Sequence, residues 1–157
     1  MTAKSDSSLS LEDIQKGFNC VAANVVKKAA EEYVALLKSG KTKEEAMEKC
    51  SQSRFVAAKV HTYGYMLAMF KEAIEEMEDR DSNETKVLET LCRLFGLWVI
   101  EEQQGYFLKC ECSPQSLLSD YDGILINLDG YFSAQQMDKV QEQVDTLCAE
   151  TRSYAGK

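Results

Sequence analysis

Apolar residues recur at steps of three and four along most of the chain, a spacing that predicts α-helices. The first helix is predicted to begin at Ser10, where Asp13 stands three residues later in the register of a capping box, and to end at Gly40. Its apolar stripe, which should face a core, comprises Ile14, Phe18, Val21, Val25, Ala29, Tyr33 and Leu36.

A second, longer helix is predicted to begin at Thr42, with Glu45 completing another capping box. No breaker follows until about Arg80, so the helix could extend over roughly 55 Å at 1.5 Å per residue. Its middle, "FVAAKVHTYGYMLAMF", is apolar on most sides. We therefore expect this helix to cross the interior with neighbours on several faces.

Two further helices complete the pattern. Ser82 or Asn83 can cap a third, which runs to about Leu108. Ser133, with Gln136 three residues later, caps the last. Their apolar faces comprise Val87, Leu88, Leu91, Cys92, Leu94, Phe95, Trp98 and Val99 in the third helix, and Met137, Val140, Val144, Leu147 and Cys148 in the last.

Between these helices the signals are weaker. Ser113 before Pro114 is a helix start signal, so a short helix or a single turn is predicted there. The only competing strand-like alternation is "ILINL" at 124–128. The pattern as a whole predicts an all-α fold, an antiparallel helical bundle that forms one domain over residues 10–157 after a flexible N-terminus at residues 1–9.

Composition limits the classes of protein to which the chain can belong. The chain has 157 residues, 45% apolar and 28% charged, which is the balance of a soluble globular domain. With a net charge of -8, the chain lacks the basic surface that nucleic-acid binding requires. The apolar-rich stretch 55–70 contains Lys59 and His61 and falls short of the roughly 20 residues of a membrane span. The N-terminus has no secretory signal, so an intracellular protein is expected.

Six cysteines allow a disulfide framework or a metal site. We interpret them as reduced core residues, because no secretory signal is recognised and four of them lie on apolar helical stripes. Cys110 and Cys112 could begin a zinc site, but one histidine and no second close cysteine pair leave the four ligands incomplete. The set comprises Cys20, Cys50, Cys92, Cys110, Cys112 and Cys148.

No catalytic residue is predicted. His61, the only histidine, is expected to be a hydrogen-bonded core residue rather than a base, and Ala58 stands where a di-iron Glu-x-x-His motif needs its glutamate. Neither a glycine-rich phosphate loop nor a Gly-x-Ser-x-Gly elbow occurs. Glu101 and Glu102 are interpreted as a solvated helix end. The cofactor-binding residues, if any, stay unknown.

Several aromatic positions are interpreted as packing residues. Trp98, with Phe95 and Phe107, is expected in the core rather than in a cofactor-stacking platform. Tyr63, Tyr65 and Met66 are expected to pack as well. Gly64 costs a helix about 1 kcal/mol relative to alanine, and the close approach of another helix is the simplest reason for it.

The stretch "SDYDGILINLDGYFSAQQ", residues 119–136, suggests a calcium loop at first sight. An EF-hand needs oxygen ligands at positions one, three and five, glycine at six and glutamate at twelve. Counting from Asp120 puts Leu125 at six and Tyr131 at twelve, and counting from Asp129 puts Tyr131 at three. Neither register fits, so no metal site is predicted.

Three segments in order resemble the C-terminal helical domain of the acyl-CoA oxidases. They are "SGKTKEEAMEKCSQSRFVAAKVHTYGYMLAMFKEAI", "VLETLCRLFGLWVIEEQQGYFL" and "GYFSAQQMDKVQEQVDTLCAETRSYA". The second carries the family pattern "LxxLCxLFxLxxI", and the third resembles "VxxxVxxLCxxxRxxA". The resemblance covers most of residues 11–155. The family joins the last two segments by a short loop, so residues at about 109–130 are interpreted as an insertion.

The resemblance implies the fold of an acyl-CoA dehydrogenase or oxidase C-terminal domain. Such oxidases use FAD to convert an acyl-CoA, in fatty acid β-oxidation, to the trans-2-enoyl-CoA with formation of hydrogen peroxide. The family's flavin domains and catalytic glutamate precede the region that matches, so no catalytic or flavin residue is assigned here. A peroxisomal location is implied, although "RSYAGK" is not a targeting tripeptide.

Two functions follow as expectations. The first is a structural and dimerisation role with no self-contained active site, in partnership with the flavin-containing domains or subunit of an oxidase. The second is a stand-alone helical interaction subunit of a larger assembly, which the acidic segment 75–81 and the missing catalytic half favour. Acyl-CoA binding in the bundle itself is a weaker third, because an acidic surface attracts CoA phosphates poorly. Whether the chain is a fragment stays open.

Overall fold

The computed structural model describes residues 9–110 and 132–155, most of which are helical. The helices are α1 (Leu11–Lys38), α2 (Lys43–Lys49), α3 (Ser51–Glu75), α4 (Asn83–Glu102), α5 (Gln104–Leu108) and α6 (Ala134–Ala155). The described part of the chain contains no strand, which confirms the all-α prediction. None of its helices is both long and apolar enough to cross a bilayer.

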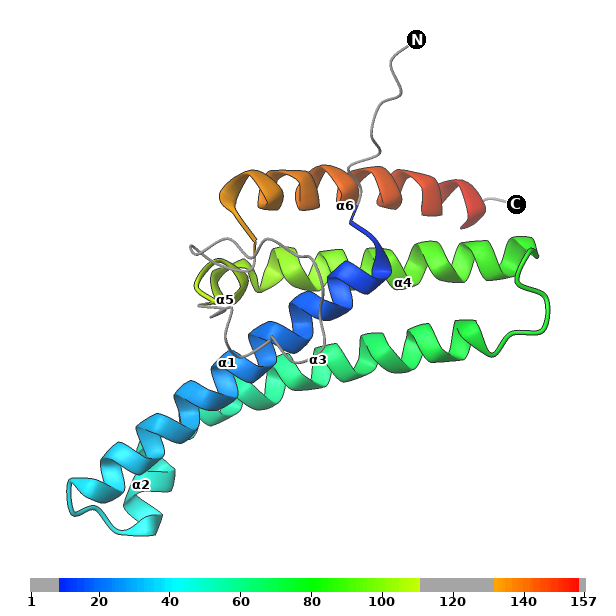
Figure 1. Ribbon diagram of the computed structural model, residues 1–157. Helices are drawn as coiled ribbons and strands as arrows, with labels where there is room; N and C mark the ends of the chain where they lie inside the picture. Colours follow the sequence, from blue (N-terminus) through cyan, green and yellow to red (C-terminus); the bar gives the residue numbers. More distant parts are fainter. Residues whose placement is uncertain (1–8, 111–131, 156–157) are drawn as a thin grey trace, which may run out of the picture.

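The long helices stack in layers (Figure 1). Helix α1 packs along α3, α3 along α4, and α4 along α6, and successive members of this series run antiparallel. Helix α2 lies at the far end of α1, where it contacts both α1 and α3. The arrangement is the antiparallel helical bundle that the sequence predicts.

Helix starts follow the predicted capping signals. The Ser10 hydroxyl accepts the Asp13 backbone N–H at 3.1 Å, and the Asp13 carboxylate accepts the Ser10 N–H at 3.3 Å. Thr42 with Glu45 repeats this reciprocal pattern. The same holds for Ser133 with Gln136, and the Ser82 hydroxyl accepts the N–H of Thr85. Each such cap stabilises its helix by about 1 kcal/mol.

The single long helix predicted over 42–80 is wrong, because the chain turns at Cys50. This residue has φ -91° and ψ 15°, so α2 ends and α3 begins there. Ala46 and Cys50 are fully buried, and the turn lets α2 fold back against α1 and α3 at the same time. The Arg54 guanidinium donates to the Met47 carbonyl, an oxygen near the end of α2. The Cys50 carbonyl accepts both the Arg54 backbone N–H and the Ser53 hydroxyl at the start of α3.

Two further helix ends differ from the predictions. Helix α3 stops at Glu75, short of Arg80, and the turn that follows is held by the Thr85 hydroxyl, which donates to the Asp79 carbonyl at 2.7 Å. The helix predicted to run to Leu108 turns at Gln103, with φ -110° and ψ 19°, so α5 continues in a new direction. The turn at Gln103 lets α5 place Phe107 in the core.

The core lies where α1, α3, α4 and α6 meet. Phe107 of α5 fills its centre, with a T-shaped contact to Phe18 at 5.2 Å between ring centroids and a tilted contact to Phe132 at 5.9 Å. The apolar segments identified in the sequence supply most of the other core side chains, which include Ile14, Val21, Val60, Leu67, Cys92, Val99, Met137, Val140, Val144 and Leu147. Leu97 and Ile100 are also in the core, although the predicted apolar face of the third helix did not include them.

Glycines let three helices approach closely. A Cβ atom added at Gly64 of α3 would lie 3.2 Å from the Phe18 Cβ of α1, which confirms the close approach predicted there. At Gly96 of α4 it would lie 2.7 Å from Ile14 Cγ2 and 3.3 Å from Leu67 Cδ1. Gly96 therefore marks the tightest point between α4 and the other two helices.

Helix α3 contacts α1, α2 and α4, but one side of it carries exposed apolar residues, so the prediction that it crosses the interior is wrong. Tyr65 and Met66 are 58% and 48% exposed, and His61 is exposed as well, so none of the three is a core residue. Trp98 of α4 is 47% exposed and is likewise outside the core. Of the neighbouring aromatic residues, Phe107 is buried as predicted, whereas Phe95 and Tyr63 are partly buried at its edge.

The prediction of six reduced cysteines is wrong for Cys20, which is disulfide-bonded. Sequence spacing does not show which sulfur atoms the fold brings together. The thiol of Cys110 lies 3.6 Å from the Cys20 sulfur. Free thiols among the described cysteines include those of Cys50 and Cys92, which are buried, and of Cys148, which is partly buried.

Several predictions fall outside the described residues. They concern Cys112, the helix signal at Ser113 and Pro114, the strand-like run 124–128 and most of the proposed insertion at 109–130. The calcium-like stretch is described only from Phe132 onward, and residues 1–8 of the predicted flexible N-terminus are also outside.

Candidate functional site

Chemistry-bearing side chains are dispersed over the bundle. His61 is exposed on α3, Glu101 is partly buried and Glu102 is exposed at the end of α4. Among the described residues, no group of three or more His, Cys, Asp or Glu side chains could hold a metal ion. A hollow on α1 is lined by side chains of that helix alone, Ala30, Glu31, Val34, Ala35 and Lys38.

One buried thiol is electrostatically unusual. Burial raises the pKa of the Cys92 thiol from 9.0 to about 11, an effect that the nearby Lys71 cation partly offsets and the Glu89 carboxylate reinforces. Cys92 is fully inaccessible and packs in the core between α3 and α4. A thiol in this setting stays protonated and unreactive at neutral pH, so its role is packing.

The bundle should lose stability at high pH because of Cys92. Its folded-state pKa is raised, so the stabilisation is fully present below pH 9.0 and is lost as the pH rises towards about 11. Two pKa units correspond to an upper limit of about 2–3 kcal/mol. Urea unfolding at several pH values should show a steeper alkaline loss in the native sequence than in Cys92→Ala, which keeps every lysine and tyrosine. Parallel pH profiles of the two proteins would contradict the assignment.

A polar junction joins three helices near the N-terminus of α1. The Gln143 side-chain oxygen of α6 accepts the Leu9 backbone N–H at 3.3 Å and an Arg93 guanidinium N–H of α4 at 3.1 Å. The Arg93 Nε atom is buried without a hydrogen-bond partner. The contacts position α6 relative to α1 and α4, and Arg93 forms no ion pair with a described carboxylate.

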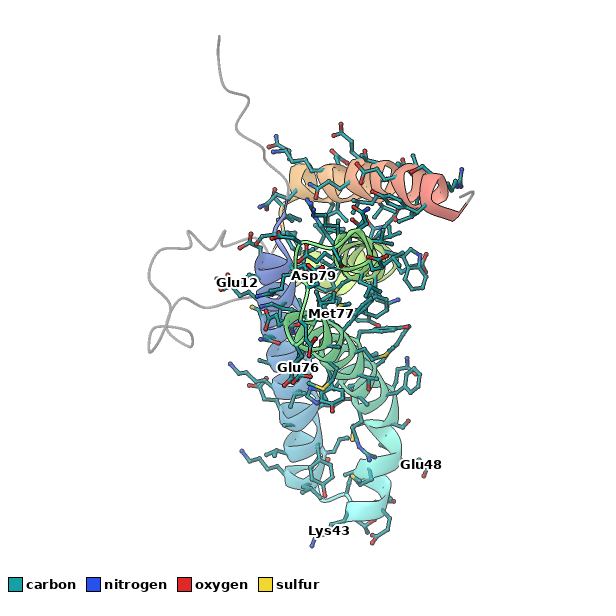
Figure 2. All side chains as sticks on the ribbon, turned by 90° about the vertical axis from the view of Figure 1, so that its right-hand side faces the viewer. Glu12, Lys43, Glu48, Glu76, Met77 and Asp79 are labelled. Carbon is teal, nitrogen blue, oxygen red and sulfur yellow. The ribbon has the colours of Figure 1, made fainter. Side chains whose placement is uncertain are left out.

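The most distinctive surface lies on α3, on the side that faces away from α1. Figure 2 shows α1 and α3 side by side, and no other helix of the described residues covers that side of α3. The seven residues that line it recur at helical spacing, are all exposed and carry no charge. We call this surface the outer stripe; it comprises Phe55, Ala58, Thr62, Tyr65, Met66, Met69 and Ala73.

Comparison with known proteins assigns the chain to a family. A family model described as acyl-CoA oxidase matches residues 10–155. The chain belongs to the acyl-CoA oxidase family. This confirms the resemblance read from the three sequence segments, and the match extends through nearly all of the described residues.

Individual relatives agree with this assignment. Acyl-coenzyme A oxidase 3 of Yarrowia lipolytica is 31% identical over 132 residues, 84% of this chain and 16% of the relative. Peroxisomal acyl-coenzyme A oxidase 2 of Rattus norvegicus is 28% identical over 122 residues, 78% of this chain and 15% of the relative. The crystal structure of Yarrowia acyl-CoA oxidase 3 superposes with a TM-score of 0.75 at 28% identity, over 94% of this chain and 18% of that one.

This chain is much shorter than those relatives. It spans only 16% of the Yarrowia oxidase 3 sequence and 18% of the chain in its crystal structure. A solved Caenorhabditis elegans acyl-CoA oxidase-2 chain, at 22% identity and a TM-score of 0.74, supports the fold alone. The match thus concerns one helical domain of a much larger enzyme.

Sequence reasoning did not identify the outer stripe as a surface. The signal was present, because the segment 55–70 was recognised as apolar on most sides. It was interpreted as burial on several faces within the chain, whereas the structure covers one face only.

Proposed function

We propose that this chain serves as the C-terminal helical domain of an acyl-CoA oxidase, where it supports the oxidase fold and contributes to dimerisation without an active site of its own. The observation that carries the proposal is the family match over residues 10–155 by a chain that spans 16% of a curated relative. The remaining five-sixths or so of such an enzyme would hold the reaction centre.

FAD is implied for the complete enzyme, and we assign it to the larger, flavin-containing portion. The hollow on α1 is lined by a single helix, whereas a cofactor of that size needs an enclosing cleft, which supports this assignment. On this proposal the complete enzyme oxidises acyl-CoA to trans-2-enoyl-CoA with formation of hydrogen peroxide. A peroxisomal location is proposed from the name of the Rattus norvegicus relative.

A graft tests this function. Residues 10–155 would replace the matching segment of Yarrowia acyl-CoA oxidase 3, which is 31% identical. We expect the chimera to retain bound flavin and acyl-CoA-dependent peroxide formation, whereas the isolated chain should have neither. Full-length Yarrowia oxidase 3 is the positive control. Peroxide formation or flavin absorbance in the isolated chain would contradict the proposal, as would a chimera without flavin.

A second candidate is a stand-alone interaction subunit of a larger assembly derived from this domain. The exposed acidic run after α3 favours it, since Glu75, Glu76, Glu78, Asp79 and Asp81 offer a charged docking surface. Figure 2 places Glu76 and Asp79 together at that end of α3. Size-exclusion chromatography of cell extract separates the candidates, because a free monomer counts against this one.

A further inference from the structure

We propose that the outer stripe of α3 is the surface through which this domain docks onto the flavin-containing portion of an acyl-CoA oxidase. The inference rests on the proposed function and specifies where the two parts meet.

Helix α3 has two apolar faces. At 100° per residue, the outer stripe lies about opposite the residues that pack into the bundle. Val60, Gly64 and Leu67 on the inner face are buried, and a Cβ atom at Gly64 would touch Phe18 of α1. From Phe55 to Ala73 the outer stripe extends over five turns, about 27 Å. A helix at the edge of a solvated bundle needs only the inner face.

The outer stripe has the composition of an interface. Phe55 is 63% exposed and Met69 41% exposed, and no charged residue interrupts the stripe in a chain that is 28% charged. An amphipathic surface helix normally turns charged residues to solvent. Aromatic residues and methionine are enriched in the cores of protein interfaces, and contiguous exposed apolar surface marks such sites.

Charges border the outer stripe in an ordered way. Arg54 and Lys59 flank its N-terminal half, and Lys59 Nζ lies 5.9 Å from the centroid of the Tyr63 ring. Glu72 and Glu76 flank its C-terminal half. We therefore expect the docking partner to present acidic groups near Phe55 and basic groups near Ala73, which would fix the orientation of α3 on it.

The greater length of the relatives indicates which partner covers the outer stripe. The helical region is 18% of one continuous chain in the Yarrowia oxidase 3 crystal structure, so the rest of that polypeptide is tethered to the same domain. A tethered partner has a high effective concentration and can dock through a surface of modest area. A second copy of this chain could compete for the same surface, and light scattering distinguishes that case from docking on the flavin-containing portion.

Methionine footprinting tests the docking without any substitution. Met47 of α2 is 40% exposed, Met66 is 48% and Met69 is 41%, so dilute hydrogen peroxide should convert all three to the sulfoxide at similar rates in the isolated chain. In the flavin-containing chimera with Yarrowia oxidase 3 we expect at least fivefold protection of Met66 and Met69, measured by mass spectrometry. Met47 is the internal control. Equal oxidation of the three residues in that chimera would overturn the proposal.

Charge substitution gives an independent test. Met66→Glu with Met69→Glu should leave the helicity and melting temperature of the isolated chain unchanged within a few degrees, because exposed substitutions alter stability little. In the chimera the same pair should reduce flavin retention several-fold. The matched control is Val34→Glu on α1, an apolar residue that is 44% exposed beside the Lys27–Glu31 ion pair. Equal flavin retention in both variants would overturn the docking site.

The outcomes separate the two proposals. If the chimera binds flavin and Met66→Glu with Met69→Glu does not reduce that binding, the proposed docking site is contradicted and the proposed function is unaffected. A chimera without flavin contradicts both. Light scattering on the isolated chain tests whether a second copy of the chain covers the outer stripe. If the chain is a dimer and Met66→Glu with Met69→Glu makes it a monomer, the outer stripe serves self-association and the proposal is overturned.

Discussion

Phe107→Ala is expected to lower the free energy of unfolding of this domain by about 3–5 kcal/mol. Phe107 has no exposed surface, and its ring contacts both Phe18 and Phe132. The substitution removes the ring and leaves a cavity where α1, α5 and the start of α6 meet, which surrounding side chains can fill only in part. Urea unfolding followed by circular dichroism measures the change.

Trp98→Ala is the control for Phe107→Ala. The residue removed is larger, but it is 47% exposed, so the loss should be about 1 kcal/mol or less. Comparable losses for the two variants would show that the aromatic centre around Phe107 does not dominate the core. The comparison also tests the structure against the sequence-based expectation, which placed both residues in the core.

Gly96→Ala is expected to destabilise the fold by about 1–3 kcal/mol, even though alanine favours a helix by about 1 kcal/mol. The added Cβ would lie 2.7 Å from Ile14 Cγ2, an atom of a β-branched side chain with no exposed surface. Relief requires α1 to move away from α4. Thermal unfolding followed by circular dichroism measures the effect as a melting temperature several degrees lower.

The other glycines provide a graded control. A Cβ at Gly64 would approach the Phe18 Cβ to 3.2 Å, so Gly64→Ala should cost less than Gly96→Ala, and Gly64→Leu more than Gly64→Ala. At Gly105 of α5 nothing lies within 4 Å, so Gly105→Ala should be neutral or slightly stabilising. A loss at Gly105 equal to that at Gly96 would mean that helix contacts do not explain these effects.

Local signals in the sequence predicted where helices begin. Ser10, Thr42 and Ser133 act as caps in the structure as their spacing indicated, because a capping box depends on residues three apart. Of the two candidates Ser82 and Asn83, Ser82 caps α4. The helix ends at Cys50 and Gln103 could not be found in this way. No glycine or proline lies near Cys50, where the break lets α2 contact both α1 and α3. Gly105 follows Gln103 by two residues, but the sequence analysis did not treat it as a helix breaker.

Burial was harder to predict than helicity. Spacing shows that an apolar face exists, but it does not show whether the same chain covers it. For α1 the predicted stripe holds the core residues Ile14, Phe18 and Val21. For α3 the inner and outer faces are both apolar, and the sequence cannot assign them to different neighbours. The missing information was the position of α1, α2 and α4, and of the larger polypeptide that we propose as a further neighbour.

The outer stripe also bears on how the free chain behaves in solution. An uncovered apolar helix face favours adhesion between molecules during synthesis and storage. The net charge of -8 opposes this, since like-charged molecules repel one another before their apolar surfaces can meet. The acidic composition thus opposes self-association through a surface that, on our proposal, is covered only after assembly.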